Sequence, residues 1–277
     1  MLAELPEAPR AAPAEPPGRQ YPPPLRGVRA AFVFFSRIPL GGFPYRASDW
    51  QWAPAHLPLV GVTVGAACAA VAALGAFAGL GSPIVATLAL GTSMWLTGAF
   101  HEDGLADSAD GLGGAHGQRK RALEIMKDSR IGTYGAVALI LSCMLRVACI
   151  AELAPGGFYG LVYVHCAARI GPVWLMATEA RVSEPEASKS PTPLQTHVVH
   201  LMTALGWGIA CAALGIYLAW LTWQAALAAA ITLAVLALLC ARYFRKAVGG
   251  VTGDLLGATE QVGEIGAWLA LLIVARS

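Results

Sequence analysis

The sequence predicts an all-α protein, a polytopic integral membrane bundle of about seven transmembrane helices with cytoplasmic polar loops. Of its 277 residues, 56% are hydrophobic and only 13% are charged. A soluble core cannot hide that much apolar surface behind so few charges, which excludes a soluble globular enzyme and a disordered chain. The formal net charge of +2 gives no reason to expect a nucleic acid as a partner. The apolar runs do not alternate with polar residues, so a transmembrane barrel is not expected either.

The amino-terminal part divides into two segments. Residues 1–24 contain eight of the 18 prolines and no apolar run, so we expect a disordered proline-rich tail and neither a signal peptide nor a span. Residues 25–277 then form a single membrane-embedded domain. Its first apolar stretch, 28–35, is too short to cross a bilayer, which indicates an interfacial or re-entrant helix.

Seven longer apolar runs follow and define the expected spans. They cover approximately residues 57–80, 82–100, 134–154, 158–178, 201–222, 224–241 and 262–275. The basic residues lie before the first run and in the loops 101–133, 179–200 and 242–260, whereas the opposite side has only Arg276. By the positive-inside rule, the amino terminus and these loops face the cytoplasm. We therefore expect a multi-pass protein of the bacterial cytoplasmic (inner) membrane, surrounded by lipid.

The first polar cluster is His101–Gly111, which reads HEDGLADSADG. Asp103, Asp107 and Asp110 recur at i, i+4 and i+7, and therefore share one face of a helix. Such a row of carboxylates repels itself unless a cation lies between its members, and converging hard oxygen ligands suit Mg²⁺. The alternative is that this helix face is simply solvated in the cytoplasm. The small apolar residues on the other faces of the helix argue against this alternative.

The second polar cluster is Glu124–Gly135, which reads EIMKDSRIGTYG. Lys127 and Arg130 are three residues apart and face the same way on a helix. Both are natural partners of phosphate oxygens. Asp128 could bind a metal or orient these cations. The alternative is a basic loop that flanks the membrane.

The third polar cluster is Gly249–Glu260, which reads GGVTGDLLGATE. Four glycines within nine residues argue against a plain helix here. Thr252 and Asp254 are placed to serve a ligand at a junction between a loop and a helix. The alternative for Asp254 is the amino-terminal cap of the last helix.

Two arginines lie inside predicted spans, and intramembrane charges indicate function by default. Arg169 is in the middle of the fourth run, with His165 one turn earlier. Arg146 is in the third run, and for it a structural pairing with Glu152 or with backbone carbonyls is an equally good interpretation. Glu264 lies near the membrane edge, where an acid needs a partner.

The motifs FFSRIP (34–39), HEDGLADSADG, EIMKDSRIGTYG and GG-TGD-LGA (249–258) occur in the order seen in cobalamin synthases. From about Leu25 to the carboxyl terminus, the chain resembles this family of adenosylcobinamide-GDP ribazoletransferases. The family often has Gln in the third motif where this chain has Val251, so any polar contact of that Gln is in doubt. The resemblance implies Mg²⁺-dependent transfer from adenosylcobinamide-GDP to α-ribazole or its 5′-phosphate, with release of GMP.

The resemblance also implies roles for the residues of the catalytic domain. Asp103, Asp107 and Asp110 would hold Mg²⁺, and either Asp128 or Asp254 would accept the proton of the nucleophile. The expected substrate-binding residues are Arg37, Lys127, Arg130, Gly132, Arg169 and Thr252. The sequence leaves open whether the chain forms a homo-oligomer.

Two competing functions are less well supported by the motifs. A lipid-forming CDP-alcohol phosphotransferase also begins its acidic motif with Asp-Gly, but that motif continues to Ala-Arg, whereas this chain has Asp107 after Ala106. It also needs two further aspartates that 111–127 lacks. A membrane transporter would bind its cargo near the bilayer midplane and often contains internal repeats. Here the acids cluster at cytoplasmic span ends, and no repeat is visible.

Overall fold

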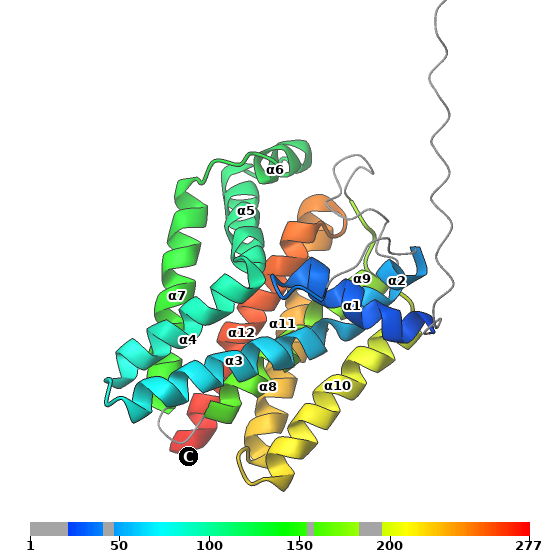
Figure 1. Ribbon diagram of the computed structural model, residues 1–277. Helices are drawn as coiled ribbons and strands as arrows, with labels where there is room; N and C mark the ends of the chain where they lie inside the picture. Colours follow the sequence, from blue (N-terminus) through cyan, green and yellow to red (C-terminus); the bar gives the residue numbers. More distant parts are fainter. Residues whose placement is uncertain (1–21, 41–46, 154–157, 183–195) are drawn as a thin grey trace, which may run out of the picture.

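The computed structural model describes residues 22–40, 47–153, 158–182 and 196–277. Within these ranges the regular structure is helical, apart from one parallel bridge between Arg181 and Val251 (Figure 1). The all-α prediction is therefore confirmed. The expected disordered tail lies outside the described residues as far as residue 21, and most of the loop 179–200 also lies outside them.

The described part of the chain contains a series of helices. In order they are α1 Pro23–Phe35, α2 Ala47–Trp52, the 3₁₀ helix η1 Ala53–His56, α3 Leu57–Phe77, α4 Ser82–Thr97, α5 Phe100–Gly114, α6 Arg119–Met126, α7 Thr133–Leu153, α8 Phe158–Ala168, α9 Ile170–Thr178, α10 Val198–Tyr217, α11 Trp223–Val248 and α12 Gly253–Arg276.

The number of helices that can cross a membrane agrees with the sequence prediction. Six continuous helical stretches in the described part of the chain are long and apolar enough to span. The one remaining expected span, 82–100, corresponds to α4, which joins α5 through a bend of 89°. Gly98 and Ala99 both have positive φ angles, 70° and 57°, and so end α4. The bend directs the polar helix α5 away from the axis of the apolar helix α4.

The last helix is longer than the sequence predicts. We expected 262–275, but α12 runs from Gly253 to Arg276. Of the four glycines that argued against a helix, Gly249 and Gly250 precede α12, Gly253 begins it, and Gly257 lies inside it where a Cβ would be 3.3 Å from Cα of Gly104. Tight packing therefore offsets the poor helix propensity of glycine.

Burial separates interior helices from those that face lipid. In the apolar windows of α8–α9 and α12, 67% and 61% of the residues are buried, against 22% in α7 and 28% in α10 and α11. The outer helices expose large apolar side chains that suit a hydrocarbon environment, among them Ile140, Met144, Ile209 and Leu239. Helix α1, with 13 residues, is not among the spanning helices and packs against α2 and η1.

Candidate active site

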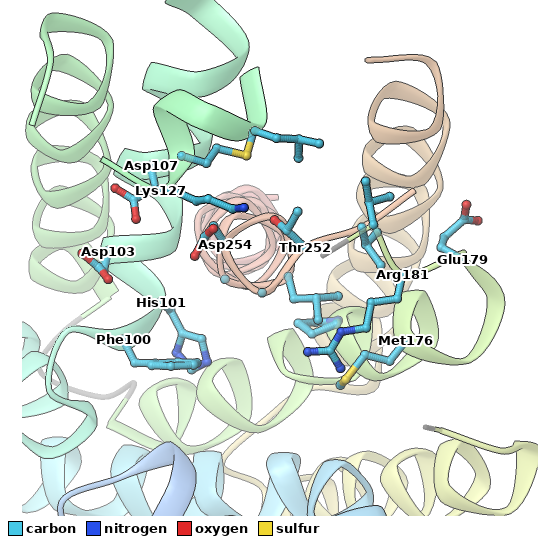
Figure 2. Close-up of a pocket in the computed structure, with 18 of the residues that line it drawn as sticks. Phe100, His101, Asp103, Asp107, Lys127, Met176, Glu179, Arg181, Thr252 and Asp254 are labelled. Atoms are coloured by element: carbon cyan, nitrogen blue, oxygen red, sulfur yellow. The ribbon is translucent and has the colours of Figure 1, made fainter. Parts of the chain in front are cut away.

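A cavity of about 770 Å³ lies where α5, α6, α9 and the start of α12 meet (Figure 2). Its wall is apolar on one part of its surface, where Phe34, Phe35 and Phe100 contribute aromatic rings. Most of the candidate residues from the three polar clusters line it together with newly found ones. The polar lining residues are His101, Asp103, Asp107, Lys120, Glu124, Lys127, Asp128, Ser129, Glu179, Arg181, Thr252 and Asp254.

Two helices bring the carboxylates of this cavity together. Helices α5 and α12 touch through their backbones, because a Cβ on Gly104 would lie 2.8 Å from the carbonyl oxygen of Asp254 and 3.1 Å from Cα of Gly257. This glycine contact places Asp103 and Asp107, which flank Gly104 in the sequence, next to the first turn of α12. Two separate sequence motifs thus contribute carboxylates to one site.

The start of α12 is arranged so that its aspartate faces the cavity. Thr252 is the amino-terminal cap, and its hydroxyl accepts a hydrogen bond from the backbone N–H of Leu255 at 3.3 Å. Asp254 lies in the first turn of the helix and lines the cavity. The cap is therefore Thr252, and the alternative interpretation of Asp254 as the cap is wrong. A negative charge in this turn also interacts favourably with the helix dipole.

The structure separates Asp110 from the other two aspartates. Its carboxylate is buried and accepts hydrogen bonds from the backbone N–H groups of Gly132, at 2.7 Å, and Gly135, at 2.9 Å. It is not among the residues that line the cavity. The i, i+4, i+7 rule put all three on one face, but the following loop folds back over Asp110 and engages it. Gly132, expected to bind substrate, instead contributes its N–H to this cradle.

The second cluster contributes Lys127 and Asp128 to the cavity, together with Glu124, Met126 and Ser129, but not Arg130. Lys127 and Asp128 line the cavity, and Figure 2 shows the Lys127 side chain extending toward Thr252 and Asp254. Arg130 is exposed and binds Asp128, with Nη2 and Oδ2 2.6 Å apart. This pairing lowers the pKa of Asp128 to about 2 and raises the pKa of Arg130. Arg130 is not a lining residue.

Arg181 is a cavity residue that sequence reasoning missed. It lines the cavity across from α5, and its backbone segment pairs with Val251: the Val251 N–H donates to the Ala180 carbonyl at 2.9 Å, and the Val182 N–H donates to Val251 at 3.0 Å (Figure 2). A Cβ on Gly250 would collide with the Ala180 oxygen. The glycine pair before Val251 was the available signal, because it indicates a close backbone approach.

Two other arginines expected to bind substrate do not line the cavity. Arg37 is exposed; its N–H donates to the Leu96 carbonyl at 2.7 Å, and its side chain lies against Gly98. Arg169 is 1% exposed and lies between the helices, where its Nη1 is 2.9 Å from Oε1 of Glu260 and 3.4 Å from Oε1 of Glu264. In this position Arg169 pairs with the acids of α12.

Arg169 belongs to a group that we name the buried charge cluster. Its members are Glu102, Arg146, His165, Arg169, Glu260, Gln261 and Glu264, each at most 4% exposed. Arg146 binds Glu102 and Glu264, whereas Glu152 pairs with Arg276, so the alternative interpretation of Arg146 as a partner of Glu152 is wrong. Three carboxylates face two guanidinium groups, and Nδ1 of His165 lies 2.5 Å from Oε1 of Glu264.

The cluster also contains an arrangement that resembles a metal site. Ligand atoms of His165, Glu260 and Glu264 lie within 4.8 Å of one another. However, Nη1 of Arg169 is within 3.4 Å of both carboxylates and 3.3 Å from Nδ1 of His165. The guanidinium group thus occupies the place that a cation would take, and a metal ion beside it would be repelled. We interpret the three residues as part of an ion-pair network.

Comparison with known proteins identifies the family. Residues 27–272 match the family described as cobalamin-5-phosphate synthase. The chain belongs to the cobalamin-5-phosphate synthase family. It is 40% identical over 252 residues to an adenosylcobinamide-GDP ribazoletransferase of Leptothrix cholodnii, covering 87% of this chain and 93% of the relative. It is also 41% identical over 259 residues to the protein of that name from Bradyrhizobium diazoefficiens, covering 91% and 94%.

Membership of the cobalamin-5-phosphate synthase family confirms the resemblance seen in the four motifs. A third relative, the adenosylcobinamide-GDP ribazoletransferase of Albidiferax ferrireducens, is 39% identical over 278 residues, which cover 90% of this chain and 98% of the relative. No solved structure matches the chain. The arrangement of the cavity therefore gives the geometry in which a cobalamin-5-phosphate synthase brings its polar motifs together.

Proposed function

We propose that the chain transfers the phosphocobinamide group of adenosylcobinamide-GDP to a hydroxyl of α-ribazole or of its 5′-phosphate. The products are adenosylcobalamin, or its phosphate, and GMP. The observation that carries the proposal is the convergence of Asp103, Asp107 and Asp254 with Lys127 and Arg181 in one cavity. Acids and cations in one cavity fit a reaction in which a metal-bound diphosphate is held and cleaved.

The donor set of the cavity fits a divalent cation. Asp103 and Asp107 on α5 and Asp254 on α12 are the carboxylates that would hold Mg²⁺, and hard oxygen ligands are what this ion takes. Asp110 is engaged by two N–H groups and is left out of the set. When bound, the metal neutralises charge on the diphosphate and on the departing GMP. The buried His165, Glu260 and Glu264 are not needed for it.

The proposed reaction is a displacement at phosphorus. The ribazole hydroxyl oxygen forms a bond to the phosphorus atom that carries the cobinamide arm, and the bond from this phosphorus to the bridging oxygen of the diphosphate breaks. The bridging oxygen leaves as part of GMP. Asp128, with its pKa of about 2, is too weak a base and is bound by Arg130. Asp254 is therefore the residue that would accept the hydroxyl proton, through the carboxylate oxygen that does not hold the metal.

The remaining lining residues bind and orient the substrates. Lys127 and Arg181 approach the cavity from different elements and would contact phosphate oxygens on two sides. Partial burial lowers the pKa of Arg181, which indicates that a bound anion would be a favourable partner. The aromatic wall formed by Phe34, Phe35 and Phe100 offers a surface on which an organic ring system can stack. Positioning of this kind supplies much of the acceleration in phosphoryl transfer.

The proposed location is the cytoplasmic membrane of a bacterium, with the cavity open to the cytoplasm. Helices α5 and α6 and the junction of α11 with α12, which include the basic residues of 101–133 and 242–260, lie at one end of the bundle (Figure 1). The turn between α3 and α4 and the carboxyl terminus lie at the opposite end. The positive-inside rule supports assigning the first end to the cytoplasm.

The deciding experiment measures GMP release by the purified chain in detergent or liposomes. With adenosylcobinamide-GDP, α-ribazole and Mg²⁺, we expect GMP and a cobalamin product in equal amounts, and neither in EDTA. Release of CMP from a CDP-alcohol would instead support a lipid phosphotransferase. Movement of corrinoid across liposomes without release of any nucleotide would support a transporter.

A further inference from the structure

The glycine contact between α5 and α12 brings their backbones together but does not fix the position of one helix along the axis of the other. Side chains that interlock normally set the register of two helices, and at Gly104 and Gly257 there are none. The carboxylates Asp103 and Asp107 on one helix and Asp254 on the other need a defined register to converge. Another group of contacts must therefore supply it.

The buried charge cluster connects the same two helices beside this contact. Nη1 of Arg146 on α7 lies 3.0 Å from Oε1 of Glu102 on α5 and 3.1 Å from Oε2 of Glu264 on α12. Gln261 of α12 donates from Nε2 to the same Glu102 oxygen at 3.4 Å. Glu102 is therefore held from two directions, once through α7 and once directly by α12.

The position of Glu102 links this network to the cavity. It immediately precedes Asp103 on α5 and is 4% exposed. On α12, Glu264 is ten residues after Asp254, which is about 15 Å along a helix. Each helix thus carries carboxylates at the cavity and an anchor in the cluster. A shift of α5 along α12 would have to break the contacts of Glu102.

Stability alone does not explain such a cluster. Removing charges from water is costly, and buried ion pairs are often no more stable than apolar residues of similar volume. Their best-attested benefit is to specify one register among several. We propose that Glu102 is a positioning residue, which fixes the register of α5 against α12 and so preorganises Asp103, Asp107 and Asp254 for a divalent cation. This inference rests on the metal site of the proposed function.

The test compares Glu102→Ala and Glu102→Gln with a matched control, Glu152→Gln. Glu152 also joins α7 to α12 through an arginine, Arg276, but this pair is exposed and lies at the opposite end of α12. Glu102→Gln keeps the shape of the side chain and leaves two carboxylates facing two guanidinium groups. We expect this variant to fold.

The first measurement is the rise in Tm that Mg²⁺ causes in the full chain without substrate, as a function of Mg²⁺ concentration. We expect at least a tenfold higher half-saturating Mg²⁺ concentration for Glu102→Ala, an intermediate increase for Glu102→Gln, and the wild-type value for Glu152→Gln. The second measurement is GMP release, in which kcat should fall and the Mg²⁺ requirement should rise in the same order.

A lower Tm in EDTA together with an unchanged half-saturating Mg²⁺ concentration in both Glu102 variants would show a merely structural role and overturn the inference. If Glu102→Ala does not insert, Glu102→Gln decides in the same way. A wild-type chain that Mg²⁺ does not stabilise also overturns it, even if GMP is released. If Mg²⁺ stabilises the chain but no GMP is released, the proposed reaction fails, while a shift in the Tm series still supports the positioning role.

Discussion

Asp103, Asp107 and Asp110 have the same side chain but different surroundings. Asp103 is exposed and Asp107 half-buried on the wall of the cavity, whereas Asp110 is buried and accepts two backbone N–H bonds. Helical spacing predicted a common face for the three, and this was sound for the helix taken alone. Gly132 just before α7 and Gly135 in its first turn, more than 20 residues later in the chain, decide that Asp110 is a structural acceptor.

The three aspartates should therefore respond differently to replacement by asparagine. Asp103→Asn and Asp107→Asn should lose most GMP release and need more Mg²⁺ for half-maximal rate, because an anionic ligand is lost. Asp110→Asn should lower the free energy of unfolding by about 1–3 kcal/mol, because an amide nitrogen cannot accept from the N–H that it would face. The measurements are Mg²⁺ titration of the rate and thermal unfolding in EDTA. Equal Mg²⁺ shifts in all three variants would contradict the separation.

A second prediction at this scale concerns the base. Arg130 lowers the pKa of Asp128 from 3.8 to about 2, so their pairing is complete above about pH 4 and is lost as the pH falls through 2. Asp128 thus stays ionised at any pH suited to assay. Asp128→Asn should leave the acidic limb of the kcat profile in place, whereas Asp254→Asn should remove it and most of the rate. An acidic limb that disappears only in Asp128→Asn would reverse the assignment.

At the scale of elements, close backbone contacts decide which segments form the site. The glycines of α5 and α12 allow these helices to touch, and Gly250 allows the segment 180–182 to pair with Val251. The pairing of 180–182 with Val251 uses only the backbone of Val251. It therefore does not require the Gln that the family often has at this position. These contacts join parts of the chain that lie far apart in sequence.

Replacing Gly250 with alanine should displace Arg181. Its Cβ would collide with the Ala180 carbonyl and break the pairing. We expect Gly250→Ala and Arg181→Gln to raise KM for adenosylcobinamide-GDP by a similar factor, of the order of tenfold, with little change in the KM for α-ribazole. Gly206→Ala is the matched control, since a Cβ there meets nothing within 4 Å and Gly206 does not line the cavity. A wild-type KM in Gly250→Ala would mean that the bridge does not position Arg181.

At the scale of the whole molecule, the bundle has one polar end and one apolar end. Helices α5 and α6, the segment 180–182 and the start of α12 gather at the first, and the turns after α3 and α10 lie at the second (Figure 1). The intramembrane charges lie between helices and pair with one another, so the lipid-facing surface stays apolar. This arrangement separates lipid contact from chemistry.

Single-cysteine labelling in a background without the six native cysteines tests the orientation. Ser129→Cys and Gly253→Cys, both exposed, should react from the cytoplasmic side only, and Gly81→Cys in the turn between α3 and α4 from the opposite side only. Ser108, although it belongs to the aspartate motif, is 3% exposed and is unsuitable for the purpose. Labelling of Ser129→Cys and Gly81→Cys from one side would contradict the topology.

The sequence by itself determined the class of the protein, the number of apolar helices and the three motifs of the site. These follow from local properties: the hydropathy of 20-residue windows, the side of the basic loops and the order of short motifs. Only the tertiary structure decided which motif residues meet. It removed Asp110 and Arg169 from the cavity, added Arg181, and extended α12 back to Gly253. The physical reason is that each depends on contacts between segments distant in sequence, which periodicity within one segment does not encode.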